Sequence, residues 1–275
     1  MPRPEDSGPP ELFYDANEAN KYTSNTRIIE IQQQMSERAL ELLALPCDSP
    51  ALILDLGCGS GLSGEVLEEN GHFWVGCDIS QSMLDIALER EMEGDVLLSD
   101  LGQGVGMFRP GMFDGAISVS ALQWLCNSNS SKENPFKRLF AFFTTLYSCL
   151  KRNAKVVLQF YPDSPQQAEL IVRQATRAGF NGGLMVDFPN STKAKKVYLV
   201  LSCGDMTFQM PRALGENDGT QCVYTANERV RLGRVDKKAM SRKQWVLKKK
   251  DRMRKLGKQV ANDSKYTGRK RSKKF

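Results

Sequence analysis

A short apolar run at residues 52–56 leads directly into a glycine-rich turn, and this turn has the clearest chemical potential in the sequence. Residues 52–64 read LILDLGCGSGLSG, which places Asp55, Gly57, Gly59 and Gly61 in a D-x-G-x-G-x-G pattern. Glycine adopts backbone angles closed to other residues and lets a ligand approach the main chain. The nicotinamide dinucleotide fingerprint has its third glycine one position later. The turn therefore predicts a ligand site that requires no pyrophosphate.

Two carboxylates follow the next two apolar runs. Asp78 follows the run FWVGC, 17 residues beyond Gly61, and Asp100 ends the segment LLSD. A carboxylate at the end of the second strand of a dinucleotide fold can accept both hydrogen bonds from a ribose diol, and Asp100 is placed to reach an adenine amino group. Each aspartate alone is an ordinary turn or cap residue. In this order after the glycine turn, the pair indicates an adenosine site.

The rest of the chain predicts how these residues are positioned. Strand-like runs alternate with amphipathic stretches, which is typical of an α/β fold with a mostly parallel sheet and helices on both faces. We expect a Rossmann-like, seven-stranded sheet, with residues 1–10 as a disordered lead-in, 11–203 as the domain and 204–275 as a basic tail. The expected strands span residues 51–56, 73–77, 96–98, 113–120, 154–161, 184–188 and 196–202. The expected helices span residues 15–45, 81–91, 135–150 and 166–178, with one more at 241–255 in the tail.

Over residues 51–202 this combination resembles the class I S-adenosylmethionine-dependent methyltransferases. The resemblance implies that the three glycines line the methionine moiety of the cofactor, that Asp78 holds the ribose, and that Asp100 lies beside the adenine. Neighbouring residues complete the expected cofactor site. Its members are Asp55, Gly57, Cys58, Gly59, Gly61, Asp78, Ile79, Asp100, Leu101 and Ser118.

The expected acceptor atom follows from motifs that the sequence lacks. Methylation of a pyrimidine C5 needs a cysteine nucleophile, usually in a Pro-Cys step, and exocyclic amines usually need Asn/Asp-Pro-Pro-Tyr after the fourth strand; here residues 118–124 read SVSALQW. Guanine N7 already has an in-plane lone pair, so its methylation needs no general base. No firm catalytic residue is therefore expected. Trp124 is a candidate for stacking on the base and favouring its cationic product, although a core tryptophan is an equally ordinary interpretation.

Cysteine and histidine usage disfavours other chemistries. Seven cysteines occur without a C-x-x-C pair and His72 is the single histidine, so neither a metal site nor a Ser-His-Asp site is expected. Residues 1–10 contain no apolar signal-peptide region, and no apolar run approaches the ~18–20 residues of a membrane span. We therefore expect a cytosolic or nuclear protein.

The charge distribution separates the tail from the rest of the chain. Residues 229–275 hold 20 Lys and Arg against 3 Asp and Glu, a net charge of +17, whereas residues 1–228 hold 18 against 29, a net charge of −11. Such a tail favours salt-dependent phosphate contacts, and the run at 269–274 suits a nuclear or nucleolar address. A solubilising or purely import tail is the alternative. The expected RNA contacts are Trp245, Lys248, Lys249, Lys250, Arg269, Lys270 and Arg271.

Five segments give a narrower resemblance, to the eukaryotic small-subunit (18S) rRNA guanine-N7 methyltransferase family. They are ELFY at 11–14, DLGCG at 55–59, GCDIS at 76–80, SALQWL at 120–125 and YTGRKR at 266–271. This resemblance implies methylation of one rRNA guanine during ribosome biogenesis in the nucleus and nucleolus, and the cytoplasm stays open as a further location. It further implies a small zinc-binding activator subunit. The apolar run Val96–Leu98, expected at a sheet edge, could pair with such a partner.

Two other functions stay open from the sequence. A small-molecule methyltransferase of the same fold would explain the cofactor motifs but leave the basic tail unexplained. A ribosome assembly factor, in which methyl transfer is dispensable, would explain the tail and use the cofactor for stability. Deletion of residues 229–275 separates the first alternative from an RNA enzyme, and substitution of Asp78 separates the second.

Overall fold

The computed structural model describes residues 3–46, 49–128, 133–191, 193–205, 208–215, 224–225, 243, 246–247, 249–250, 254 and 260–264. The chain divides into two compact units, Pro9–Glu228 and a second unit formed by Met1–Gly8 with Arg229–Phe275. The first unit therefore extends beyond residue 203, where the sequence placed the end of the domain.

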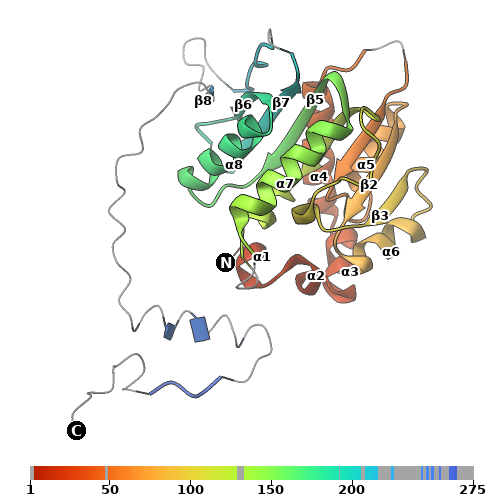
Figure 1. The fold of residues 1–275 in the computed structure, drawn as a ribbon. Coiled ribbons are helices and arrows are strands. Elements are labelled where there is room, and N and C mark those ends of the chain that lie inside the picture. Colours follow the sequence, from red (N-terminus) through yellow and green to blue (C-terminus); the bar gives the residue numbers. More distant parts are fainter. Residues whose placement is uncertain are drawn as a thin grey trace. The chain divides into compact units, whose positions relative to one another are not determined.

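The unit Pro9–Glu228 is built on a sheet with strand order β3-β2-β1-β4-β5-β7-β6-β8 (Figure 1). The pairs β1–β2, β2–β3, β1–β4 and β4–β5 are parallel, whereas β7 runs antiparallel to β5 and β6. The expected seven-stranded, Rossmann-like sheet is confirmed, and the two-residue β8 is an addition that the sequence did not predict. The strands are β1 (Leu52–Leu56), β2 (Phe73–Asp78), β3 (Asp95–Leu98), β4 (Phe113–Val119), β5 (Leu150–Phe160), β6 (Phe180–Asp187), β7 (Lys196–Cys203) and β8 (Tyr224–Thr225).

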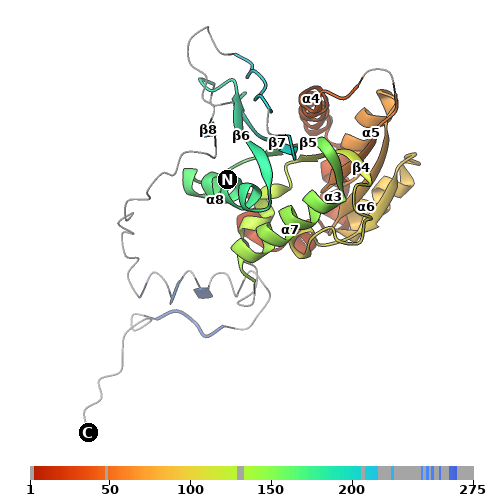
Figure 2. The same ribbon diagram turned by 45° about the horizontal axis from the view of Figure 1, so that its top comes forward.

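Helices cover both faces of this sheet, and α4 and α7 lie on opposite sides of β5 (Figure 2). Side chains alternate between faces along a strand, so Ile53 packs in one core and Leu54 in the other. Both strand faces must therefore be apolar, which explains the short apolar runs of the sequence. One core is covered by α4 (Thr26–Leu43), α5 (Leu62–Glu69) and α6 (Gln81–Glu89), and the other by α7 (Pro135–Cys149) and α8 (Pro165–Arg177).

Several boundaries differ from those expected. The helix expected over residues 15–45 is two helices, α3 (Ala16–Ser24) and α4, because the Asn25 side chain accepts hydrogen bonds from the backbone N–H groups of Arg27 and Ile28 and starts a new helix. Helix α5 was not expected at all. Strand β5 begins at Leu150, before the expected residue 154, through an exposed polar start that shows no apolar alternation.

Where the sequence predicted a disordered lead-in over residues 1–10, the structure describes two short helices. Helix α1 (Pro4–Ser7) lies in the second unit, and α2 (Pro10–Phe13) begins the first. Proline at the first helical position is pre-organised for a helix, which explains how a Pro-rich segment becomes helical. In the tail, residues 243, 246–247, 249–250 and 254 are helical, within the expected helix at 241–255.

Neither a membrane-spanning helix nor a metal-binding cluster is found among the described residues. No described helix is both long and apolar enough to cross a membrane. The same residues contain no group of three or more His, Cys, Asp or Glu side chains that could hold a metal ion.

Candidate active site

The glycine turn between β1 and α5 adopts a backbone that requires glycine. Gly57, Gly59 and Gly61 have φ angles of +79°, +54° and +82°, in the left-handed region. A Cβ atom at Gly57 would overlap the Cβ of Ala121, and one at Gly59 would lie 2.9 Å from Cε of Met83. The turn therefore passes so close to its neighbours that the backbone itself forms the pocket wall.

Asp78, at the end of β2, connects this turn to the sheet. Its Oδ2 accepts a hydrogen bond from the Gly59 N–H at 2.9 Å, and its Oδ1 accepts one from the Ser80 N–H at 2.8 Å. Burial raises the pKa of the Asp78 carboxyl, and the hydrogen bonds from backbone N–H groups act in the opposite direction. A carboxylate offers about four lone-pair sites, so Asp78 can hold the turn and still accept hydrogen bonds from a ribose diol.

Asp100, after β3, is held by a residue that sequence reasoning missed. Its Oδ1 accepts hydrogen bonds from the Gly102 N–H and from Nη2 of Arg138, both at 2.8 Å. Arg138 belongs to α7, is largely buried, and also lines the pocket. Nothing in the local sequence links it to Asp100, 38 positions away.

One pocket at the carboxyl ends of the parallel strands brings most of the expected residues together. Ligands of open α/β sheets bind in this place. Expected residues that line the pocket are Gly57, Cys58, Gly59, Asp78, Ile79, Asp100, Leu101 and Trp124. Lining residues outside the expected set include Tyr14, Tyr22, Gln32, Ser120, Ala121 and Arg138.

Three residues of the expected cofactor site do not line this pocket: Asp55, Gly61 and Ser118. Asp55 is fully buried behind the glycine turn and its Oδ2 accepts a hydrogen bond from Ser63 Oγ at 2.5 Å. The pKa of the Asp55 carboxyl is raised to about 7, mainly because the group is buried. The hydrogen bond from Ser63 lowers this pKa, and the nearby charge of Asp78 raises it. Ser118 Oγ donates to the Leu56 carbonyl at 2.6 Å and connects β4 to β1. The structure gives these residues supporting positions, and their direct contact with a cofactor stays a prediction.

Trp124 lines the pocket but is only 8% exposed. The rings of Phe13 and Tyr14 each lie 5.9 Å from it between centroids. The sequence did not predict these two neighbouring rings. Stacking of Trp124 on a substrate base therefore requires the base to pack beside Phe13 and Tyr14 or to displace them.

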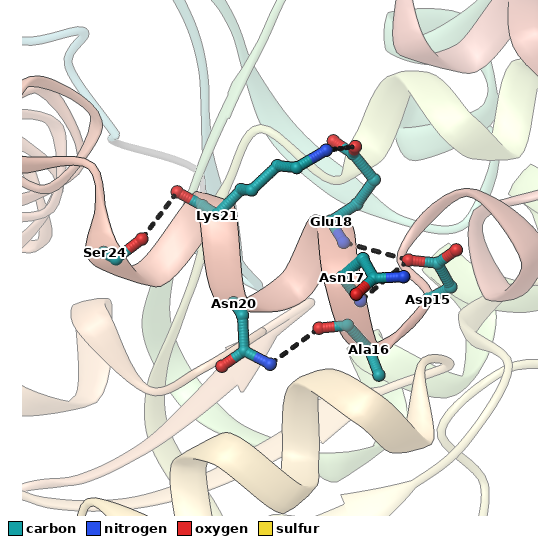
Figure 3. Close-up of polar contacts among 7 residues, drawn as sticks. All are labelled: Asp15, Ala16, Asn17, Glu18, Asn20, Lys21 and Ser24. Atoms are coloured by element: carbon teal, nitrogen blue, oxygen red, sulfur yellow. Dashed lines mark hydrogen bonds and ion pairs between the residues drawn. The ribbon is translucent and has the colours of Figure 1, made fainter.

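The segment from α2 to α3 places aromatic side chains over the pocket. The Tyr14 carbonyl accepts a hydrogen bond from Ser80 Oγ at 2.9 Å, and Tyr22 lines the pocket from the other end of α3. Helix α3 is stabilised at its start because Asp15 accepts hydrogen bonds from the N–H groups of Asn17 and Glu18, both at 2.9 Å (Figure 3). Polar exposed residues dominate this segment, so its covering role left no apolar signal in the sequence.

Comparison with known proteins extends over the whole chain. A model described as "Methyltransferase domain" matches residues 54–158, and one described as "Methyltransferase involved in Williams-Beuren syndrome" matches residues 201–273. The 18S rRNA (guanine-N(7))-methyltransferase of Mus musculus is 56% identical over 99% of this chain and 98% of its own length. The chain belongs to the 18S rRNA (guanine-N7)-methyltransferase family. The probable 18S rRNA (guanine-N(7))-methyltransferase of Dictyostelium discoideum, also a member, is 52% identical over the full length of both chains.

A solved structure supports the same fold for this 18S rRNA methyltransferase family member. Haemonchus contortus phospholethanolamine N-methyltransferase 2, in complex with S-adenosylhomocysteine, is 18% identical and has a TM-score of 0.54, over 70% of this chain and 58% of that one. The chain is a methyltransferase and its cofactor is S-adenosylmethionine. The residues present fit that cofactor, because a glycine-rich turn and two carboxylates line one pocket.

All but the last two residues of the basic tail of this methyltransferase lie within the second matched region, residues 201–273. Of the residues expected to contact RNA, Lys249 and Lys250 are described, and Lys250 Nζ pairs with the Asp263 carboxylate at 2.9 Å. The other expected contacts lie outside the described residues: Trp245, Lys248, Arg269, Lys270 and Arg271.

Proposed function

We propose that this chain transfers a methyl group from S-adenosylmethionine to N7 of a guanine in 18S rRNA and acts in small-subunit biogenesis. The observation that supports this most strongly is similarity at 56% identity to a methyltransferase named for that reaction, over 99% of this chain. The second support is the pocket, where the glycine turn, Asp78 and Asp100 meet.

The residues around the pocket suit an acceptor that needs no deprotonation. Bound S-adenosylmethionine supplies an activated methyl group. Guanine N7 offers its own lone pair and loses no proton, so the protein's task is alignment and stabilisation of the positive charge that develops on the base. Tyr14, Tyr22 and Trp124 contribute aromatic side chains to the pocket lining, and the faces of aromatic rings attract cations. The glycine turn and the two carboxylates are proposed to hold the cofactor in the same pocket.

The basic tail, residues 229–275, is proposed to bind the rRNA backbone. Its net charge of +17 is far from that of an ordinary solvated helix, and each phosphate that it neutralises makes the affinity more salt-dependent. Deletion of the tail should therefore remove methylation of rRNA while leaving cofactor binding intact. Full methyl transfer to RNA by the truncated chain would count against this role, and would reopen the small-molecule alternative.

The function is tested by nucleoside mass spectrometry of purified 18S rRNA. Cells depleted of the protein receive either the wild type or Asp78→Lys, which places a cation where the ribose diol should bind. We expect N7-methylguanosine to disappear on depletion and to return with the wild type alone. An unchanged level after depletion would contradict the proposal. Normal small-subunit assembly with Asp78→Lys, but without the modification, would favour the assembly-factor role.

A partner subunit is proposed to cover the free edge of β3. Among the described residues β3 ends the sheet, and Leu97 and Leu98 are exposed, as are Phe73 on β2 and Leu88 on α6. An apolar edge strand favours addition of a strand from another chain, and the family resemblance suggests a small zinc-binding activator.

The partner proposal is tested by substituting Leu98→Lys. The added charge should reduce co-purification of the partner, and Lys137→Leu, on the exposed start of α7, is a control of opposite charge change. Soluble and active protein expressed alone would contradict the need for a partner. The basic run at residues 269–274 is suited to nuclear targeting. We therefore propose that the protein and its partner act in the nucleus and nucleolus, with the cytoplasm as a further location.

A further inference from the structure

The turn that follows β4 has an unusual backbone at a residue that lines the pocket. Ser120 has a φ angle of +61°, in the left-handed region that residues other than glycine rarely adopt. Such a conformation persists where the surrounding structure enforces it, and it is concentrated at functional sites. The residues that hold Ser120 in this conformation therefore bear on the function of the pocket.

Gln159, on the central strand β5, is the residue that holds Ser120. Its Oε1 accepts hydrogen bonds from the Ser120 N–H at 3.0 Å and from Ser120 Oγ at 2.9 Å. A backbone N–H can only donate, so the amide oxygen must be the atom that faces it. The backbone carbonyl of Gln159 accepts from the same N–H at 3.1 Å. The side-chain and backbone carbonyl oxygens of Gln159 thus both accept hydrogen bonds from Ser120.

A second buried amide fixes the other side of the same residue. Nε2 of Gln123 donates to the Ser120 carbonyl at 2.8 Å. Gln159 is fully buried and Gln123 nearly so, and within the described part of the chain Gln159 Nε2 and Gln123 Oε1 have no hydrogen-bond partner. A buried polar atom without a partner is costly. An apolar side chain on β5 would avoid that cost. The contact of the Gln159 amide with Ser120 is therefore what offsets it.

The position of Ser120 determines the position of two pocket residues. Ala121, the next residue, lies so close to Gly57 that a Cβ atom added at Gly57 would overlap the Cβ atom of Ala121. Trp124 lies in the 3-10 helix η2 (Leu122–Cys126) that starts after this turn. A change in the φ angle of Ser120 would therefore move the wall that faces the cofactor turn.

We propose that Gln159 is a positioning residue for methyl transfer, because its side-chain carbonyl holds Ser120 in the left-handed conformation that sets Ala121 and Trp124 against the pocket. The inference rests on the proposed function. Gln159 does not line the pocket, and acts through the turn. A misplacement of about 1 Å in a reacting geometry can lower a rate about a hundredfold.

The test compares Gln159→Met in two backgrounds of the full-length chain. Glycine adopts a positive φ without strain, so Ser120→Gly should remove the need for Gln159. The rate of methyl transfer is measured at saturating S-adenosylmethionine, with small ribosomal subunits from depleted cells as substrate. The affinity for S-adenosylmethionine and the melting temperature are measured on the same proteins. Gln174→Met is the matched control, since Gln174 is also a buried amide with an unpartnered Oε1 but lies on α8 rather than on the strand that contacts Ser120.

We expect Gln159→Met to lower kcat about tenfold to a hundredfold in the wild-type background, with the Kd for S-adenosylmethionine within about twofold. In the Ser120→Gly background the same substitution should lower kcat less than about threefold. An equal loss in both backgrounds, or an equal loss with Gln174→Met, would overturn the positioning role. Wild-type protein that transfers no methyl group would instead overturn the proposed function. A fully active Gln159→Met beside an active wild type would overturn this inference alone.

Discussion

Two turns meet at the carboxyl ends of the neighbouring parallel strands β1 and β4, and both adopt a left-handed backbone beside the pocket. Gly57 reaches a φ angle of +79° without any side chain, whereas Ser120 reaches +61° with the help of an amide from β5. The first solution depends on residue type at one position. The second depends on a contact between residues 39 positions apart. Binding and alignment at one site can therefore rest on very different sequence signals.

The largest effect should come from the glycine turn. Gly57→Val places a branched side chain where Ala121 already lies and requires it to adopt a positive φ angle. We expect loss of detectable S-adenosylmethionine binding in calorimetry and of N7-methylguanosine in 18S rRNA.

Gly71→Val separates the backbone cost from the loss of the site. Gly71 has a φ angle of +76° but an added Cβ would meet no atom within 4 Å. This variant should lose about 1–3 kcal/mol of stability and keep cofactor binding. If both variants lost cofactor binding equally, general destabilisation, and not the loss of the site, would explain the effect of Gly57→Val.

Asp78→Asn should weaken S-adenosylmethionine binding about tenfold to a hundredfold, because a charge-assisted hydrogen bond to the ribose becomes a neutral one. The change keeps the size of the side chain, but an amide has a single acceptor oxygen, so one of the two hydrogen bonds from the N–H groups of Gly59 and Ser80 is lost as well. Titration calorimetry measures the effect. Asp114→Asn is the control. Asp114 also accepts a hydrogen bond from a backbone N–H, that of Leu52, but lies at the amino ends of the parallel strands, away from the pocket. Equal Kd values for both variants would remove Asp78 from the cofactor site.

Arg138→Met should weaken S-adenosylmethionine binding by about fivefold, because Asp100 loses a charged partner that fixes its orientation. Lys151→Met, which breaks the ion pair with Asp114 outside the pocket lining, is the control. Calorimetry at low and high salt distinguishes a direct charge effect from a packing effect. A Kd identical to that of the wild type would show that Arg138 serves the packing of α7 alone.

Of the substitutions considered, Asp55→Asn should have the smallest effect on methyl transfer and the largest effect on how stability depends on pH. Burial raises the pKa of the Asp55 carboxyl from its ordinary value of 3.8 to about 7 in the folded protein. Between these values the folded state retains a proton that the unfolded state has lost, so the free energy of unfolding falls as pH rises from about 4 to 7, by up to about 1.4 kcal/mol per pH unit. Thermal melts from pH 5 to 7.5 should show this slope in the wild type. The same slope in Asp55→Asn would assign it to another group.

Local spacing explains what the sequence predicted well. The glycine turn, Asp78 and Asp100 each follow an apolar run that forms a parallel strand, so their convergence at one sheet edge follows from strand direction alone. Apolar runs also located every strand of three or more residues, because helices cover both faces of the sheet.

Contacts between distant segments explain what the sequence did not predict. Arg138 reaches Asp100 from α7, Gln159 reaches Ser120 from β5, and Tyr14 reaches the pocket through a bond to Ser80. None of these pairs shares a local pattern. Asp55 belongs to the glycine motif by spacing, but its side chain points behind the turn and supports it from the core. A motif thus locates a site more reliably than it assigns each member a role.

The most direct test of the central claim is transfer of an isotopically marked methyl group. The full-length chain, with its partner if one is required for solubility, is incubated with trideuteromethyl S-adenosylmethionine and small ribosomal subunits from depleted cells. The 18S rRNA is then digested and its nucleosides are analysed by mass spectrometry. The proposed function predicts N7-trideuteromethylguanosine with the wild type and none with Gly57→Val. A label on another atom or another nucleoside, or no label on RNA from an enzyme that binds its cofactor, would contradict it.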